Sequence, residues 1–412
     1  MKVAVITPWF PNRRDGWPAR FVSDSAIALA HAGARVSVGV LRGFTPPGLD
    51  RFVPVEHRGA IDASAFPELE RLRTKRYFTL PGGLAQPLKN LALDWAAASA
   101  LLEEIADLRP HVVHAHTEML APAAVEAGKR HGLPVVVTLH GQNTNSRYIA
   151  SPNQERRFRE ALSLAERVVI VGEPLRPFAA RLAGRNDHIV TVWNGVTPPP
   201  ERRQPPVPDD APIEFVTVAN LQEGKGVDLL LAAFGRLGIS DINSWRLAII
   251  GDGPMRRALQ AQAGEAGLLE RVAFAGVMTN AAVIERLKSA DVFVLPSYRE
   301  AFGIVYLEAM ASGLLTVGVE GQGPAQFITH GRTGLLVKPM DVDSVETALR
   351  QIISDRGRSW RAIATAGAEH ARGTCTWAAH AEKLLTVFRA AIAARSKGAH
   401  DSAARRLEDA AP

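Results

Sequence analysis

The chain has 412 residues, of which 47% are hydrophobic and 22% are charged. This length predicts two or three domains, and the composition is typical of a globular protein, which excludes the collagen-like, disordered and disulfide-stabilised classes. The longest apolar runs are far shorter than the roughly 20 residues that a membrane-spanning helix needs. A single cysteine excludes an intrachain disulfide and fits a reducing compartment, so we expect a cytoplasmic protein.

The net charge of +6 is small for a chain of this length. Basic residues are scattered and aromatic residues make up 6% of the chain, so the sequence shows no stacking platform for nucleic acid. We expect no nucleic-acid partner, and the positive excess favours anionic small molecules or an acidic membrane surface. The first ten residues lack a following small-residue cleavage site, which predicts a strand and not a signal peptide.

Short runs rich in Val and Ile alternate with amphipathic stretches along the first half of the chain. The runs do not alternate with polar residues, which predicts parallel strands covered by helices on both faces. The expected strands are Lys2–Thr7, Arg35–Leu41, Val112–His116, Pro134–Leu139, Arg167–Val171 and Ile189–Val192. The expected helices are Arg20–Ala32 and Pro122–Arg130. Residues 42–83 show no clear period, and we expect loops and short helices there.

Residues 197–212 contain seven prolines, which excludes a strand or a helix interior and predicts a linker between domains. The strand–helix alternation then restarts. The expected strands are Ile213–Ala219, Arg246–Ile250, Val272–Phe274, Asp291–Leu295 and Leu315–Val319, and the expected helices are Val227–Leu237, Met255–Glu265, Ala281–Ser289 and Ile304–Ser312. The fold class is therefore α/β, with two Rossmann-like doubly wound domains at 1–196 and 213–375 that face a central cleft.

The segment after the strand Asp291–Leu295 carries the densest signal for a binding site. A helix expected to begin at Ile304 follows Gly303, and its first N–H groups suit a phosphate or sugar oxygen. Glu308 lies one turn into that helix and Glu300 lies in the loop before it, so both acids are expected at one pocket mouth. Either acid alone is more simply a solvated surface carboxylate.

A second signal is Lys225, which lies between Gly224 and Gly226, after a strand and before a helix. A lysine there is a flexible point charge suited to a diphosphate. The pattern lacks the spacing of a Walker loop, and by itself it is a weak motif. Residues 251–254 resemble the start of a dinucleotide fingerprint, but no third glycine follows, so an NAD-binding site is excluded.

In the first domain, Gly16 follows the first strand and could let the backbone approach a phosphate, although a plain turn explains it equally well. His114 and His116 end one expected strand on a shared face, and His140 follows the next strand. Three histidines at strand ends could bind a metal. No carboxylate shares their spacing, so hydrogen bonding to a sugar is favoured.

Six segments together carry a family resemblance: REAFGIVYLEAMASG with its E-x7-E pattern, ANLQEGKGVDLLLAAF, IIGDGP, VWNGV, HVVHAHTEML and VVVTLHGQ. In their order along the chain they resemble the family 4 retaining glycosyltransferases of GT-B fold, from Met1 to about Val337. Subfamilies that build exopolysaccharides and teichuronic acid are similar. The resemblance implies an acceptor-binding first domain, a nucleotide-sugar-binding second domain and a final helix at 376–395 that packs back on the first. Residues 398–412 are expected to be a flexible tail.

The resemblance also implies roles for individual residues. Lys225 and Gly16 would hold the donor diphosphate, Glu308 the ribose, and Glu300 the donor sugar, while His140 would lie near the reacting carbon. The implied catalytic residues are His140, Glu300 and Lys225. The implied donor-binding residues are Gly16, Asn220, Lys225, Glu300, Phe302, Gly303, Ile304, Val305 and Glu308. The implied acceptor-binding residues are His114, His116, Asn143 and Arg147.

These roles imply transfer of a hexosyl group from a UDP- or GDP-linked sugar, with retention of configuration, by front-face attack and without a metal or other cofactor. The acceptor would be a glycan, a lipid-linked molecule or a small molecule, as in polysaccharide biosynthesis. Arg71, Arg73, Lys75 and Arg76 could touch an anionic acceptor or the inner face of a membrane, although a solvated charged surface is at least as simple. The sequence leaves the oligomeric state open.

Two alternatives remain: a non-catalytic nucleotide-sugar-binding protein, and a sugar epimerase or phosphorylase of the same fold. The chain departs from the family pattern at two positions that bear on them. Asn220 stands where many members have Arg, which removes a positive charge from the diphosphate site. Gln326 stands where many members have an acid.

Overall fold

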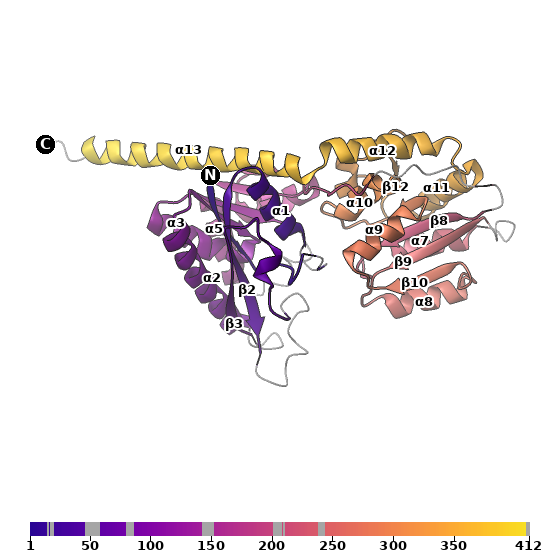
Figure 1. The fold of residues 1–412 in the computed structure, drawn as a ribbon, viewed down its shortest axis with the longest axis horizontal. Coiled ribbons are helices and arrows are strands. Elements are labelled where there is room, and N and C mark those ends of the chain that lie inside the picture. The colour runs from indigo at the N-terminus through magenta and orange to yellow at the C-terminus, as the bar shows by residue number, and fades with distance from the viewer. Residues whose placement is uncertain are drawn as a thin grey trace. The chain divides into compact units, whose positions relative to one another are not determined.

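The computed structural model describes residues 1–14, 16, 20–45, 58–79, 86–141, 152–200, 208, 211–237 and 244–408. The chain divides into two compact units (Figure 1). Unit 1 comprises Met1–Val171, Leu175–Trp193 and Trp377–Pro412, and unit 2 comprises Gly172–Pro174 and Asn194–Thr376. Each unit is built on one parallel β-sheet, and the last segment of the sequence belongs to the unit that contains the first.

The sheet of unit 1 has seven strands in the order β3-β2-β1-β4-β5-β6-β7, and every paired strand is parallel to its neighbour. The strands are β1 (Lys2–Thr7), β2 (Arg35–Phe44), β3 (Arg71–Phe78), β4 (Val112–His116), β5 (Val135–Leu139), β6 (Arg167–Ile170) and β7 (Ile189–Thr191). This is the strand order of a doubly wound sheet. Its direction of winding reverses between β1 and β4.

The sheet of unit 2 repeats this topology with six parallel strands, in the order β10-β9-β8-β11-β12-β13. They are β8 (Ile213–Val218), β9 (Trp245–Ile250), β10 (Val272–Gly276), β11 (Val292–Val294), β12 (Leu315–Val319) and β13 (Leu335–Val337). The winding reverses between β8 and β11, and ligands of such sheets bind outside the carboxyl ends of the strands at that point. The predicted pair of Rossmann-like doubly wound sheets is confirmed.

Helices cover both faces of each sheet (Figure 1). Those of unit 1 are α1 (Arg20–His31), α2 (Gln86–Leu108), α3 (Ala121–His131), α5 (Pro152–Leu164), α6 (Arg176–Ala183) and α13 (Trp377–Glu408), with short 3-10 helices η3 (Ala63–Ala65) and η5 (Glu118–Leu120); η6 (Glu173–Leu175) contains residues of both units. Glycine ends two of them: Gly132 after α3 and Gly184 after α6 adopt φ of +67° and +70°. Only glycine takes this left-handed conformation without steric cost.

The helices of unit 2 are α7 (Val227–Gly235), α8 (Arg256–Glu265), α9 (Asn280–Lys288), α10 (Ile304–Ala311), α11 (Val342–Asp355) and α12 (Trp360–Thr374), with the 3-10 helix η8 (Gly323–Gln326). Side chains cap two of them. Thr279 accepts a hydrogen bond from the Ala282 N–H at the start of α9, and Asp341 accepts one from the Ser344 N–H at the start of α11. In the part of the chain that the structure describes, no helix is both long and apolar enough to cross a membrane.

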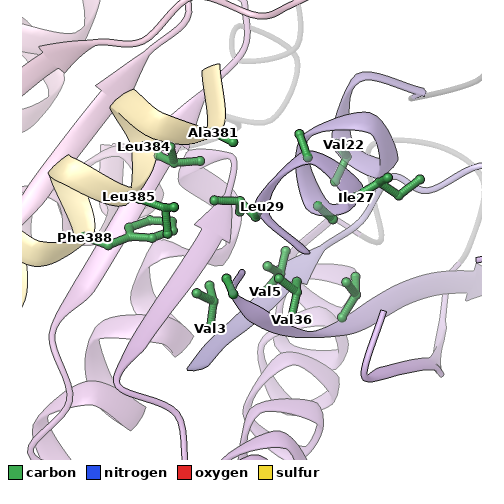
Figure 2. Packing of buried hydrophobic residues seen from close by; sticks show 14 of the residues in the cluster. Val3, Val5, Val22, Ile27, Leu29, Val36, Ala381, Leu384, Leu385 and Phe388 are labelled. Atoms are coloured by element: carbon green, nitrogen blue, oxygen red, sulfur yellow. The ribbon is translucent and has the colours of Figure 1, made fainter. Parts of the chain in front are cut away.

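The long helix α13 closes the core of unit 1 (Figure 2). Its apolar face carries Ala381, Leu384, Leu385 and Phe388, which pack with residues of α1 and with Val3 and other inward-facing residues of the sheet. Phe388 is fully buried. The helix runs to Glu408, beyond the end near Arg395 that the sequence predicts, because the Ala, Arg and Glu residues that follow favour a helix.

The described residues of 42–83 include the short helix η3 and loops, as the sequence predicts, but they also differ from that prediction. They contain the end of β2 and the whole of β3, which pairs with β2 from Ser37↔Arg71 to Phe44↔Phe78. β3 is an edge strand, and charged side chains are common on edge strands because they discourage pairing with other chains. Because four of its eight residues are basic, the strand lacks the apolar run by which the other strands are predicted.

The basic residues of this edge strand are already paired within unit 1. Arg71 and Arg73 contact Asp107 at 2.5 and 2.7 Å, and Lys75 contacts Glu103 at 2.6 Å, both acids lying on α2. Arg76 lies over the ring of Phe44. Local acids therefore neutralise three of the four charges that suggested an anionic partner.

Replacing Phe388 by Ala tests whether α13 is part of the unit 1 core. A buried Phe→Ala change costs about 3–5 kcal/mol, so we expect Phe388→Ala to lower the free energy of unfolding by that amount in urea titrations followed by circular dichroism. The neighbouring exposed Arg389→Ala is the control and should change it by less than about 0.5 kcal/mol. Equal effects of the two changes would contradict the packing.

Candidate functional site

The loops that follow β8 and β11 are joined at the carboxyl edge of the unit 2 sheet. The Gly224 carbonyl accepts hydrogen bonds from the Ser297 hydroxyl at 3.1 Å and from the N–H groups of Tyr298 and Arg299 at 3.0 and 3.2 Å. Gly224 lies after β8, and its three donors lie after β11. This joint lies at the point where the strand order of unit 2 reverses, which is where such sheets bind ligands.

Glycine is required at 226 for the two loops to meet. Gly226 adopts φ of +70°, and a Cβ atom at this position would lie 2.1 Å from the Pro296 carbonyl oxygen. No side chain can be accommodated at that distance. The glycine thus permits contact between backbones and places Lys225, its neighbour, directly against the loop after β11.

Lys225 and Glu300 form the central contact of the site. The Lys225 Nζ is 2.9 Å from Glu300 Oε2, and only 19% and 12% of the two side chains are exposed. Two further hydrogen bonds hold the backbone of Glu300. Its N–H donates to Gln322 Oε1 at 3.1 Å, and its carbonyl accepts from the Gly323 N–H at 2.9 Å. Two residues predicted from separate motifs are therefore brought into direct contact.

The helix α10 presents its amino end at the same edge. Gly303 precedes it with φ of +85°, and a Cβ there would lie 2.5 Å from Tyr306 Cδ2, so glycine is needed. Among the described residues, no side chain caps α10, and none caps α7, which begins after Gly226. Uncapped first-turn N–H groups carry partial positive charge and attract anions. Two such helix ends follow the two central strands.

The other residues of unit 2 that the sequence predicts to bind the donor differ in which of their atoms are accessible. Phe302 is buried and its ring packs against Phe327, with centroids 5.3 Å apart, so only its backbone is left for the predicted sugar contact. Ile304 and Val305 form the half-buried first turn of α10. Glu308 lies in the next turn, and its Oε1 accepts a hydrogen bond from Asn280 Nδ2 at 3.2 Å.

The two departures from the family pattern have structural partners. Asn220 is exposed, and its Oδ1 faces Gly253, where a Cβ would approach it to 2.7 Å. The Gln326 amide accepts from the Glu173 N–H at 2.8 Å and donates to the Gly323 carbonyl at 3.0 Å. A carboxylate at 326 could accept but could not donate, so the amide is the group that fits both contacts.

The histidines of unit 1 form a cluster at the carboxyl ends of β4 and β5. His116 Nδ1 lies 2.7 Å from His140 Nε2, and the two rings stack 5.0 Å apart. His114 lies 4.4 Å from the His116 ring and its Nε2 contacts the Thr138 hydroxyl at 2.7 Å. His114 and His116 are 1% and 3% exposed, so their predicted contact with an acceptor has no support here, whereas His140 is half-buried.

A fourth histidine, which the sequence analysis does not single out, extends this cluster from α13. His380 Nδ1 is 2.7 Å from the Trp193 carbonyl oxygen and must donate to it, so Nε2 accepts from the Ser25 hydroxyl at 2.7 Å. Burial lowers the pKa of His380 to about 4 and that of His116 to about 3. Burial also lowers the pKa of His140 well below its usual value. The cluster is neutral at pH 7 and can act by hydrogen bonding.

Glu118 is a second residue that the sequence analysis does not single out. It follows Thr117, whose φ of +77° is strained for a β-branched residue, and only 1% of its surface is exposed. Burial raises the pKa of its carboxyl to about 7. Glu118 lies within the segment HVVHAHTEML, but the sequence does not show that its carboxylate is buried, because that burial arises from packing.

Other predicted residues stand apart from these contacts. Gly16 lies in unit 1, in the loop after β1, and its N–H donates to the Arg13 carbonyl at 3.0 Å. Asn143 and Arg147 lie outside the described residues. Within the described ranges, no group of three or more His, Cys, Asp or Glu side chains is arranged to hold a metal ion.

Two family models match consecutive halves of the chain. Residues 18–198 match the model described as Glycosyltransferase Family 4, and residues 199–369 match the one described as Glycosyl transferases group 1. Glycogen synthase from Mycobacterium tuberculosis is 29% identical over 293 residues, which cover 63% of this chain and 68% of that protein. The GDP-mannose-dependent alpha-(1-6)-phosphatidylinositol monomannoside mannosyltransferase from Mycolicibacterium smegmatis is 31% identical over 186 residues, which cover 43% of this chain and 48% of that protein.

Solved structures share the fold along nearly the whole chain. Sucrose-phosphate synthase from Thermosynechococcus elongatus superposes with a TM-score of 0.71 at 21% identity, covering 95% of this chain and 99% of its own. Anabaena Alr3699/HepE in complex with UDP gives a TM-score of 0.69 at 17% identity, covering 94% and 100%. The fold is thus that of the two-domain GT-B glycosyltransferases. With both family models matched, the chain belongs to the family 4 glycosyltransferases, and it is a glycosyltransferase.

The buried histidines predict how stability depends on pH. Folded His380 stays neutral down to about pH 4, whereas in the unfolded chain it binds a proton near pH 6.5. The unfolded state therefore binds more protons between these values, and the free energy of unfolding should fall as the pH is lowered from 7 to 5. Each such histidine contributes at most about 1.4 kcal/mol per pH unit.

Urea titrations at pH 5, 6 and 7 measure this slope. His380→Gln should flatten it by about 1 kcal/mol per pH unit, whatever it does to stability at pH 7. His131→Gln, at the exposed end of α3, is the control. An unchanged slope in His380→Gln would show that this ring is not held neutral by the fold.

Proposed function

We propose that this glycosyltransferase binds a nucleotide-diphosphate sugar in unit 2 and transfers its hexosyl group with retention of configuration. The observation that carries this proposal is the Lys225–Glu300 contact where the strand order of unit 2 reverses, beside two uncapped helix ends. Such an edge combines positive charge with hydrogen-bond acceptors. An activated sugar needs both, for its phosphates and for its hydroxyl groups.

In this proposal the positive groups stabilise the leaving nucleotide diphosphate. Negative charge develops on the phosphate oxygen as the glycosidic bond to the nucleotide breaks, and fixed positive groups at that place lower the barrier. Lys225 and the first-turn N–H groups of α7 and α10 supply this charge. We propose that the chain itself, and not a metal ion, supplies it.

The two acids hold the hydroxyl groups of the donor. The Glu300 carboxylate, whose residue is held at the backbone by Gln322 and Gly323, accepts hydrogen bonds from the sugar, and Glu308 accepts them from the ribose diol. His140 is proposed to contact the sugar near the reacting carbon as a neutral ring, which suits a position where added positive charge would oppose an oxocarbenium-like centre. The departing phosphate takes the proton of the attacking acceptor.

The comparisons support two donor classes. One solved relative is a complex with UDP, and another relative is by its description GDP-mannose-dependent. We therefore propose a UDP- or GDP-linked sugar as the donor and a glycan, a lipid-linked molecule or a small molecule as the acceptor. A non-catalytic sugar-nucleotide-binding protein is the alternative, and turnover of donor by the purified protein separates the two.

Lys225→Ala tests the donor site. A charge-assisted hydrogen bond is worth about 1.5–3 kcal/mol, so this change should weaken binding of UDP-glucose or GDP-mannose about 10- to 100-fold in isothermal titration calorimetry. Lys288→Ala, which removes a lysine that pairs with Glu285 on α9, is the control and should bind as wild type does. Wild-type affinity in Lys225→Ala would show that the donor binds elsewhere.

Retention is tested by the stereochemistry of the product. With an α-linked donor, the first glycosidic bond formed should be α, as read from the one-bond carbon–proton coupling at the anomeric centre in NMR spectra of the early reaction mixture. Formation of the β anomer would contradict front-face attack. Because the product is observed directly, this result does not depend on the assignment of any one residue.

A further inference from the structure

The candidate donor site is short of positive charge. Lys225, Glu300 and Glu308 contribute one positive and two negative formal charges, and Lys225 is already in contact with Glu300. A nucleotide sugar adds two negatively charged phosphate groups. The amino ends of α7 and α10 contribute only about half an elementary charge each. A further cation would make binding of such a ligand favourable.

Arg299 lies directly beside this site. Its N–H is one of the three donors to the Gly224 carbonyl, and Gly224 precedes Lys225 in the chain. A Cβ atom on Gly224 would meet Cδ, Cβ and Cγ of Arg299 at 2.9, 3.0 and 3.2 Å. The aliphatic part of Arg299 therefore lies along the glycine loop, in the space that a side chain at 224 would occupy.

The guanidinium group of Arg299 is weakly held. Its Nη2 is 3.9 Å from Glu223 Oε1 and its Cζ is 6.0 Å from the centre of the Tyr298 ring, both long contacts, and 57% of the Arg299 side chain and 75% of the Glu223 side chain are exposed. Exposed ion pairs with this separation contribute little, so the group can turn toward a stronger anion at small cost. Arg256, near the loop after β9, is held more firmly, because it contacts both Asp252 and the Phe274 carbonyl.

We propose that Arg299 is a donor-binding residue of this chain, a second cation that contacts the donor diphosphate together with Lys225. It supplies from the loop after β11 the positive charge that the neutral Asn220 at the end of β8 does not. A planar guanidinium binds two phosphate oxygens at once, so Arg299 should favour a diphosphate over a monophosphate. This inference rests on the proposed function, since it assumes a nucleotide donor in unit 2.

The test measures binding of UDP and UMP, and of GDP and GMP, by calorimetry. Arg299→Ala should raise the Kd of the diphosphate that wild type binds about tenfold, and that of its monophosphate about twofold or less. Arg299→Lys, which keeps the charge but not the planar fork, should fall between wild type and Arg299→Ala. Arg236→Ala is the control. Arg236 is similarly exposed, but it follows the carboxyl end of α7, away from the amino end that borders the site, and it pairs with Asp343.

The outcomes separate this inference from the proposed function. Selective loss of diphosphate affinity in Arg299→Ala supports it. Unchanged diphosphate affinity, or equal loss for both ligands, overturns it, while weakened binding by Lys225→Ala in the same experiment leaves the donor site standing. Wild-type protein that binds none of the four nucleotides overturns both proposals.

Discussion

The proposed donor site depends on one joint between loops, the Gly224 carbonyl that accepts three hydrogen bonds from the loop after β11. The strands β8 and β11 are neighbours in the sheet but lie far apart in the sequence. The site therefore exists only once the sheet of unit 2 has formed. Because two of these three hydrogen bonds join backbone to backbone, Lys225 and Glu300 are held by the fold and not merely by their mutual attraction.

Much of this arrangement is predictable from sequence for a physical reason. Strands buried on both faces appear as unbroken apolar runs, so the bounds of Val112–His116 and Leu315–Val319 are predicted as the structure has them. Ligand groups of doubly wound sheets follow the carboxyl ends of strands. The residues after β8 and β11 thus stand out as soon as the strands are placed, and the Lys225–Glu300 contact confirms that their loops meet.

Features set by long-range packing are not predictable in this way. The edge strand β3 carries charges that conceal its period, and those charges are neutralised by acids of α2, which lies outside the strand's own sequence. His380 contacts Trp193 and Ser25, partners far from it in the chain, and no motif marks it. The hydrogen bonds to the Gly224 carbonyl are equally unpredictable, since every residue has a backbone carbonyl and the residue type does not show what it accepts from. The sequence therefore predicts which functional side chains follow the strands, but it does not predict the long-range contacts that hold those side chains in position.

The two departures from the family pattern bear on whether the site is active. In a protein that had lost its donor site, neutral residues at these positions would be expected beside a broken Lys225–Glu300 contact. Instead that contact is present, and Gln326 links the Glu173 N–H to the Gly323 carbonyl, whose own N–H holds the Glu300 carbonyl. An acid at 326 could not donate the hydrogen bond to the Gly323 carbonyl. The neutral amide thus supports Glu300 through the backbone, which agrees with the proposed donor site and not with a decayed one.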